Sequence, residues 1–310
     1  MGRVWVVGSL NVDKRWRVER HPTVGETIFG QVLPPAPGGK GLNQAVAAAR
    51  MGAEVRLVGR VGADDDGREL VARAVAEGID VSFVEVADDA TITGTALIVI
   101  DADGANTVTV DPGANAGLVV SAERPLGIAA GDVVVAQLEV PAEAVAAAFA
   151  EARAVGATCV LNPSPIGDEG WAVAQAADVV VLNEHEAYDL AGPAAHWLDT
   201  ADRIEIMCRP GQHMIATLGA EGAIAVGKDR EGALVGSLLR IEGSATTAVD
   251  TTGAGDCFLG VLAAGLADGL GFQPSIVRAN QAAAISVGRL GAVAAMPTAD
   301  EVDAELATED

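Results

Sequence analysis

Cysteine and histidine are rare in this chain of 310 residues. Its three cysteines, Cys159, Cys208 and Cys257, lie far apart and include no Cys-x-x-Cys pair, and its four histidines are scattered. An odd number of widely spaced cysteines argues against a disulfide framework and against a zinc site. The cysteines are therefore predicted to be free thiols.

Basic residues are also few. Lysine and arginine total 20 against 43 aspartate and glutamate residues, which gives a formal net charge of -23. Such a field repels nucleic acid and anionic membranes, so neither is an expected partner. An anionic nucleotide can still bind, because local N–H groups and a divalent cation overcome the global field at short range.

Long hydrophobic runs are missing. The longest apolar stretches, such as 4–7, 133–136 and 179–182, are far shorter than the ~20 residues that span a bilayer. They suit buried parallel strands instead. The chain begins with a strand-like segment and without a basic start, a longer apolar run and a cleavage site, so we expect a cytoplasmic protein.

Strand-like runs alternate with alanine-rich helical stretches along most of the sequence. This alternation predicts βαβ units and an α/β fold with a mainly parallel sheet covered by helices. Two segments, 13–32 and 91–111, alternate apolar and polar residues instead and predict antiparallel strands in a small accessory sheet. The core is then expected to comprise 1–12, 33–90 and 112–310.

Residues 250–258 read Asp-Thr-Thr-Gly-Ala-Gly-Asp-Cys-Phe, a turn of small residues that leads into a helical run. Free N–H groups at a helix start bind anions, and Asp256 would place a carboxylate beside them. An N–H cradle next to a base suits phosphoryl transfer. The alternative is a helix start at which Asp256 merely complements the dipole.

A second glycine turn precedes another predicted helix. Residues 38–45 read Gly-Gly-Lys-Gly-Leu-Asn-Gln-Ala, without the spacing of a P-loop. Its glycines let a polyol approach the backbone, and Asn43 can hydrogen-bond a sugar hydroxyl. Asn11 and Asp13 follow the first strand, where open α/β sheets bind ligands, although Asn and Asp also favour ordinary turns.

Three further groups of polar residues follow predicted strands. Glu139 ends one of them and is a site candidate by position, or it caps a helix. Asn183 and Glu186 follow another and could meet a hydrated magnesium ion or a phosphate group, or simply begin a surface helix. Thr217 and Gly219 could contact phosphate oxygens, although the segment alone reads as a hairpin turn.

Taken in order from residue 6 to about residue 297, these segments resemble the ribokinase (phosphofructokinase B) family of carbohydrate kinases. The two most specific matches are residues 38–45, similar to the family's sugar signature, and residues 250–256, similar to its carboxy-terminal signature. The lysine in the first signature is more similar to the ribokinases of this family than to its fructokinases or adenosine kinases. The resemblance implies a ribokinase-like three-layer α/β/α core, with the accessory sheet as a lid.

The resemblance also implies the roles of individual residues. Asp256 would be the general base, and Gly253, Ala254 and Gly255 would form the anion hole. Glu186 would act through a hydrated Mg²⁺ ion. The sugar site would comprise Asn11, Asp13, Gly39, Lys40, Gly41, Asn43, Glu139 and Asp256. The nucleotide site for ATP would comprise Asn183, Glu186, Thr217, Gly219, Gly222, Gly255 and Asn280.

A monovalent cation of the potassium class activates members of this family. Its ligands, mostly backbone carbonyls, would map to Asp250, Thr252, Ser286, Arg289 and Gly291. One ligand position that is usually serine is Ala295 here, which departs from the family pattern. The resemblance further implies a homodimer that pairs through the lids.

The function implied is ATP-dependent phosphorylation of D-ribose to D-ribose 5-phosphate. Within the same fold the alternative is a kinase for another sugar or a nucleoside, such as deoxyribose, fructose, adenosine or pseudouridine. A different class of protein, a non-catalytic sugar or nucleotide sensor, is the second alternative. The intact Asp256 and its glycine turn argue against that sensor.

Overall fold

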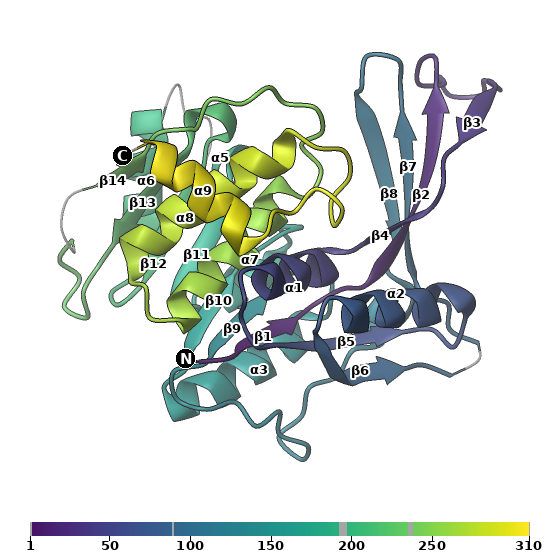
Figure 1. Cartoon of the computed structure of the whole chain (residues 1–310). Helices are drawn as coiled ribbons and strands as arrows, with labels where there is room; N and C mark the ends of the chain where they lie inside the picture. Colours follow the sequence, from purple (N-terminus) through teal and green to yellow (C-terminus); the bar gives the residue numbers. More distant parts are fainter. Residues whose placement is uncertain (1, 89, 192–196, 235–237, 310) are drawn as a thin grey trace.

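The large sheet forms the centre of the molecule. The computed structural model describes residues 2–88, 90–191, 197–234 and 238–309 (Figure 1). Within these ranges nine strands lie in the order β14-β13-β12-β11-β10-β9-β1-β5-β6, and all run in the same direction except β13, which pairs antiparallel with both β12 and β14. They are β1 (Val4–Val7), β5 (Val55–Val61), β6 (Asp80–Val86), β9 (Val133–Ala136), β10 (Thr158–Leu161), β11 (Val179–Asn183), β12 (His213–Thr217), β13 (Ala223–Gly227) and β14 (Leu239–Ile241).

Helices cover both faces of this sheet. Successive residues of β1 point to opposite faces, and each face has its own hydrophobic cluster: Val4 and Val6 belong to one, Trp5 and Val7 to the other. The first cluster packs α1 (Lys40–Arg50), α2 (Asp65–Ala76), α7 (Ala254–Ala267), α8 (Phe272–Val287) and α9 (Ala299–Glu309). The second packs α3 (Ala142–Val155), α4 (Asp168–Ala174), α5 (Glu184–Ala191) and α6 (Trp197–Met207). The predicted three-layer α/β/α architecture is confirmed.

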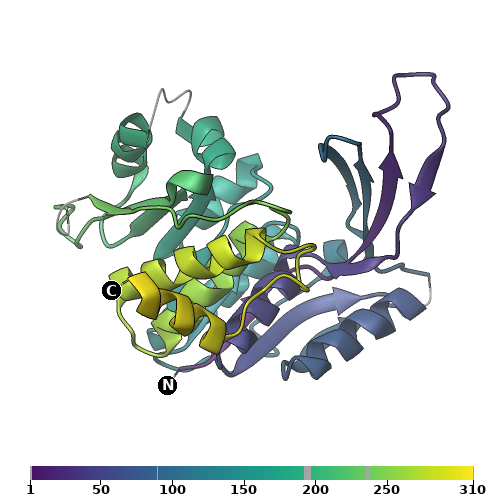
Figure 2. The same cartoon turned by 45° about the horizontal axis from the view of Figure 1, so that its top comes forward.

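A smaller sheet stands apart from the helices (Figures 1 and 2). Its strands are β2 (Asn11–Val18), β3 (Gly30–Val32), β4 (Ala36–Gly38), β7 (Gly94–Ile100) and β8 (Asn106–Asp111). The accessory sheet was correctly predicted, but its strands are not all antiparallel, because β2 and β7 pair in parallel. Both follow strands of the large sheet, β1 and β6, that point the same way, so both leave the core in the same direction. Short 3₁₀ turns, η1 (Gly113–Gly117) and η2 (Gly219–Glu221), complete the described elements.

No helix within the described ranges is long and apolar enough to cross a membrane. The three cysteines are free, as predicted, and all are buried. Burial raises the pKa of the Cys257 thiol, next to the candidate base, to about 12. The nearby charge of Asp256 acts in the same direction, so Cys257 is a packing residue with little thiolate character.

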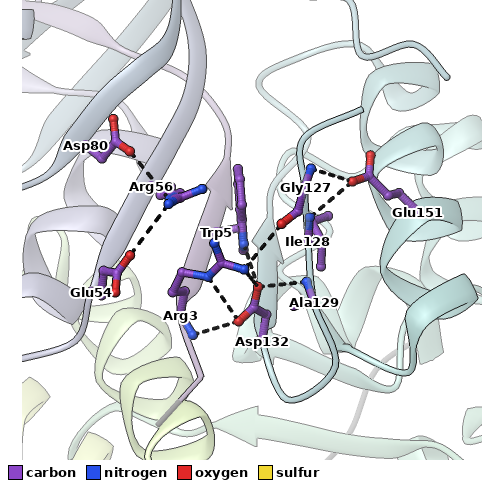
Figure 3. A network of polar contacts seen from close by, with 10 residues as sticks. All are labelled: Arg3, Trp5, Glu54, Arg56, Asp80, Gly127, Ile128, Ala129, Asp132 and Glu151. Atoms are coloured by element: carbon purple, nitrogen blue, oxygen red, sulfur yellow. Dashed lines mark hydrogen bonds and ion pairs between the residues drawn. The ribbon is translucent and has the colours of Figure 1, made fainter. Parts of the chain in front are cut away.

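A polar network closes the amino-terminal end of the sheet (Figure 3). The indole N–H of the fully buried Trp5 donates to Asp132, and the guanidinium groups of Arg3 and Arg56 lie over its ring. Asp132 also accepts hydrogen bonds from the backbone N–H groups of Arg3 and Ala129 and from the Arg3 guanidinium. Burial raises the pKa of Asp132, but these hydrogen bonds outweigh it and hold the pKa below its usual value.

We expect Asp132→Asn to lower the free energy of unfolding at pH 7 by about 2 kcal/mol, because it leaves buried donors without a charged acceptor. A carboxylate with a depressed pKa contributes stability above its unfolded-state pKa and loses it as the pH falls through the folded-state value. The measurement is urea unfolding at pH 7. Asp303→Asn, which breaks the exposed pair with Arg278, is the control and should cost less than about 1 kcal/mol. Equal losses would contradict the assignment.

Candidate active site

The candidate site lies where the order of strands in the large sheet reverses. From β1 the chain proceeds to β5 and β6 on one side, and from β9 to β10, β11 and β12 on the other. Ligands of open α/β sheets bind beyond the carboxyl ends of strands at such a switch point. Ser9 and Asn11 follow β1, and Glu139 follows β9. These side chains meet there.

Glu139 links the two sides of the switch point. One of its oxygens, Oε2, accepts hydrogen bonds from the Ser9 hydroxyl at 2.5 Å and from the backbone N–H of Lys40 at 3.1 Å. The Asn11 amide lies 3.5 Å from the same oxygen. Asn115, which is buried in η1, donates to Asn11 Oδ1 at 2.7 Å and fixes the orientation of that amide.

The turn before α1 needs glycine. Gly39 has φ +90°, and a Cβ there would lie 2.7 Å from Asn11 N and 2.9 Å from Ser9 O. The turn passes so close to β2 that the first residues of α1, including Gly41, are held beside Asn11 and Glu139.

Asp13 has a carboxyl group without a hydrogen bond or ion pair in the described part of the chain, and it lies against the backbone of Gly38. Its pKa is raised to about 7, mainly by burial, and the charges of Glu139 and, to a smaller extent, Asp256 contribute in the same direction. Arg15 acts in the opposite direction but does not offset them. An acceptor without a protein donor is available to a ligand.

Asp256 joins α7 to α1. Its Oδ2 accepts a hydrogen bond from the Asn43 side-chain amide and its Oδ1 one from the Gln44 amide, both at 2.9 Å. Asn43, Gln44 and Asp256 are all buried. Asn43 Oδ1 is buried and has no partner among the described residues. The base candidate and one predicted sugar-binding residue are therefore in direct contact, with a free acceptor beside them.

The amino terminus of α7 is built to receive an anion. Gly253, at the N-cap, is left-handed with φ +76°, and a Cβ there would come within 2.8 Å of Ala292 Cβ. No side chain caps this helix, so N–H groups of its first turn are open to a ligand. Three consecutive residues of this turn, Ala254, Gly255 and Asp256, line a cavity.

That cavity has a volume of about 410 Å³ and reaches from Asp256 to β11. Asn183 and Glu186 form a reciprocal pair at its far side: Asn183 N–H donates to Glu186 Oε2, and Glu186 N–H donates to Asn183 Oδ1, both at 2.9 Å. Asn162 also donates to Glu186 Oε2, at 3.2 Å, and leaves Oε1 without a partner among the described residues. One carboxylate oxygen is thus free to face a cation or its waters.

Lys40 is the basic residue that lines this cavity. Burial by itself would lower the pKa of Lys40, but the surrounding carboxylates Asp256, Glu139 and Glu186 outweigh it and raise the pKa. Lys40 therefore keeps a positive charge in a strongly acidic site. A cation in this position favours a negatively charged ligand between α1 and α7.

A second cavity, of about 450 Å³, continues from the first and has a more apolar lining, with Phe258, Ala283 and Val287. Five of the residues predicted for the nucleotide site line it: Thr217, Gly219, Gly222, Gly255 and Asn280. Thr217, Gly219 and Gly255 line the first cavity as well, so the two cavities are joined there. The polar cavity with the anion turn suits the phosphates of a nucleotide, and the more apolar cavity joined to it suits the aromatic base.

Two of the predicted cation ligands, Thr252 and Gly291, contact Asp250, which precedes the anion turn in the chain. Asp250 accepts hydrogen bonds from the N–H groups of Thr252 at 3.0 Å and Gly291 at 2.9 Å. Burial raises the pKa of Asp250, but these hydrogen bonds outweigh it and lower the pKa. Ser286 O accepts from Arg289 N, whereas the Arg289 guanidinium pairs with Glu301 of α9 and takes no part in this group.

The structure adds residues to which the sequence analysis gave no role. They are Ser9, Gln44, Asn115, Gln137 and Asn162. Ser9, Gln137 and Asn162 follow β1, β9 and β10, so the rule that identified Glu139 could have identified them. Asn115 carries no such signal, because only the folded chain brings η1 beside β2.

Known proteins resemble this chain over nearly its whole length. The family described as pfkB family carbohydrate kinase matches residues 1–299. The ribokinase of Staphylococcus aureus is 34% identical over 315 residues, which is 97% of this chain and 98% of that protein. Two ribokinase structures are also similar: that of Cryptococcus neoformans with ADP (TM-score 0.84, 28% identity, 98% of this chain and 100% of that one) and that of Arabidopsis thaliana with ribose and ATP (TM-score 0.82, 26% identity, 99% of each chain).

The buried Asp13 predicts a pH-dependent stability. The folded protein holds this proton up to about pH 7, whereas the unfolded chain releases it near pH 3.8, so the carboxylate destabilises the fold as the pH rises. We expect Asp13→Asn to be more stable than the wild type at pH 8, by on the order of 2 kcal/mol, and the difference to shrink from pH 7 to pH 4. Urea unfolding at several pH values, with the exposed Asp103→Asn as control, measures this. A difference that did not change with pH would contradict it.

Proposed function

The chain belongs to the pfkB family of carbohydrate kinases, and from that premise we propose that it transfers the γ-phosphoryl group of ATP to the 5-hydroxyl of D-ribose. The ribokinase relatives and the ribokinase structure that holds ribose and ATP support this substrate pair. The observation that carries the proposal is the position of Asp256, between an uncapped helix amino terminus and the Asn43 amide.

The sugar would bind at the switch point between β1 and β9. Asn43 Oδ1 and the Asp13 carboxyl group are buried or half-buried acceptors without protein donors, and hydroxyl groups of a ring can supply the missing hydrogen bonds. Asn11 and Glu139 are held in place by Asn115 and Ser9. The turn at Gly39 and Gly41 leaves space for the sugar beside the backbone.

Asp256 would act as the general base. It takes the proton of the 5-hydroxyl while that oxygen attacks the γ-phosphorus in line and the bond to the ADP oxygen breaks. The turn of Gly253, Ala254 and Gly255 would form the anion hole, in which the N–H groups of Gly253 and Gly255 would stabilise the charge that develops on the phosphoryl oxygens. The Ala254 N–H donates to Thr251 O at 3.2 Å in this structure. Lys40 lies in the same cavity and adds a positive charge.

The nucleotide would occupy the joined cavities. Its phosphates would lie in the polar cavity near Asn183, Thr217 and Gly219, and its base in the apolar cavity near Gly222 and Asn280. The Asn280 amide donates to Glu242 O at 3.0 Å, so it supports the wall of the cavity. Phe258 and Val287 supply the apolar contacts that an aromatic base requires.

The residues present fit a hydrated Mg²⁺ ion and a monovalent cation. Glu186 offers one free carboxylate oxygen, and no group of three metal-ligating side chains occurs within the described ranges, so Mg²⁺ would keep most of its waters. The ion would neutralise phosphate charge when bound. Asp250, with its lowered pKa, supplies the charge for a K⁺ ion, which would support the anion turn. Thr252, Ser286, Arg289 and Gly291 would contribute carbonyl groups, and the methyl group of Ala295 contributes no ligand atom.

The small sheet would act as a lid and as the contact of a homodimer. The lid would consist of 13–32 and 91–111, and the core of 1–12, 33–90 and 112–310. Apolar side chains of Phe29, Val32, Val108 and Val110 are exposed on this sheet or next to it. Exposed apolar patches of this kind mark interaction surfaces. We also propose a cytoplasmic location for this kinase, which agrees with its three free, buried cysteines.

The kinase proposal predicts the outcome of a coupled assay of ADP release with magnesium-ATP across ribose, deoxyribose, fructose, adenosine and pseudouridine, with and without potassium. We expect ribose to give the highest kcat/KM, potassium to raise it, and Asp256→Asn to lower kcat by on the order of 10² to 10⁴. Asp268→Asn, at the exposed far end of the same helix, is the control. If another compound of the panel gave the highest kcat/KM, that compound would replace ribose as the proposed substrate. If none of them caused ADP release, the result would favour the non-catalytic sensor.

The dimer proposal predicts that, at micromolar concentration, the protein sediments in the analytical ultracentrifuge with the coefficient expected for a dimer. We expect Val108→Glu to shift the protein to the monomer, because it places a charge on the exposed apolar surface of the small sheet. Ile206→Glu changes an even more exposed apolar residue, on α6, and should leave the dimer intact. A wild-type monomer would overturn the proposal.

A further inference from the structure

Two consecutive residues of α1 hold the Asp256 carboxylate. Asn43 donates to one oxygen and Gln44 to the other, each at 2.9 Å. Gln44 is fully buried, and neither it nor Asn43 lines the two joined cavities. The two donors differ in their amide oxygens: Asn43 Oδ1 has no partner among the described residues and can meet the sugar, whereas Gln44 Oε1 already accepts a hydrogen bond from Gln137. Gln44 therefore reaches the reaction only through Asp256.

Close packing of the helices makes this arrangement possible. Gly260 lies one turn after Asp256 on the same face of α7, and a Cβ there would come within 2.6 Å of Ala47 Cβ and 3.0 Å of Ala48 N. Only a residue without a side chain lets α7 approach α1 so closely. The short distance between the helices brings the Gln44 amide to the carboxylate.

Gln137 fixes which end of the Gln44 amide faces Asp256. Its side-chain N–H donates to Gln44 Oε1 at 2.6 Å, so the NH₂ group of Gln44 is the end that meets the carboxylate. Gln137 is fully buried directly after β9, and its own Oε1 has no partner among the described residues. The hydrogen bonds thus run in one direction, from Gln137 through Gln44 to Asp256.

We propose that Gln44, oriented by Gln137, is a positioning residue for the base of the phosphoryl transfer, an inference that rests on the function proposed above. The χ2 torsion of an aspartate is soft, so a carboxylate with one donor can rotate away from the substrate hydroxyl. Donors on both oxygens hold it in one orientation.

The test compares Gln44→Met with the wild type in the ADP-release assay. A lost hydrogen bond to a charged group commonly corresponds to a 10- to 100-fold effect, and we expect kcat to fall by that factor. The KM values for ribose and for ATP should stay within about threefold, because Gln44 touches neither. Asn43→Ala, by contrast, should lower kcat and also raise the KM for ribose.

A double-mutant cycle tests the role of Gln137. Gln137→Met should lower kcat in the wild-type background and have little further effect in Gln44→Met, because the two residues act in series. Gln212→Met is the matched control: this buried glutamine donates to Ala174 O and Ala177 O away from the site, and its loss should lower Tm without changing kcat. If Gln44→Met does not fold, Gln44→Asn, which shortens the amide, replaces it.

Each outcome decides the matter. A wild type that phosphorylates ribose while the Gln44 variants keep its kcat overturns the positioning role and leaves the proposed function intact. Additive losses of kcat in the double mutant, or parallel changes in kcat and both KM values, also overturn it. A wild type silent on every sugar overturns the proposed function itself.

Discussion

The close packing of α1 against α7 determines the geometry of the site. Both helices begin at the same edge of the large sheet, one at the Gly39 turn and the other at the Gly253 turn (Figure 1). Gly260 sets how near they come, and the hydrogen bonds of Asp256 to Asn43 and Gln44 join their first turns. The proposed base, the proposed sugar-binding residue Asn43 and the glycine turn before α7 are therefore joined in one hydrogen-bonded unit. The accessory sheet and the nucleotide cavities are arranged around it.

The charges in this unit favour an uncharged sugar beside a charged nucleotide. Asp13, Glu139 and Asp256 surround the switch point and repel each other, which is one reason why the pKa of Asp13 is raised. A neutral polyol can hydrogen-bond to these groups, whereas an anionic sugar would be repelled. The triphosphate is attracted by Lys40 and the open N–H groups of α7, which act at short range within a chain of net charge -23.

Much of the fold and of the candidate site could be predicted from the sequence. Asn11 and Glu139 follow buried strands, and the position after a parallel strand is enough to place a side chain at the ligand edge. The parallel pairing of β2 and β7 could not be predicted in this way, because it depends on which strands of the core precede them. Likewise, the orientation of Gln44 depends on Gln137, 93 residues away, and no local pattern encodes that contact.

The hydrogen bond between Asn43 and Asp256 joins residues 213 positions apart. Local contacts form early in folding, whereas a contact between distant segments requires a long loop to close first. A chain still being synthesised presents Asn43 early but lacks α7 and Asp256 until more than four-fifths of the 310 residues have been made. Partly made or partly folded chains thus cannot bring the proposed base to its partners, so the proposed catalysis begins only when α7 has packed against α1.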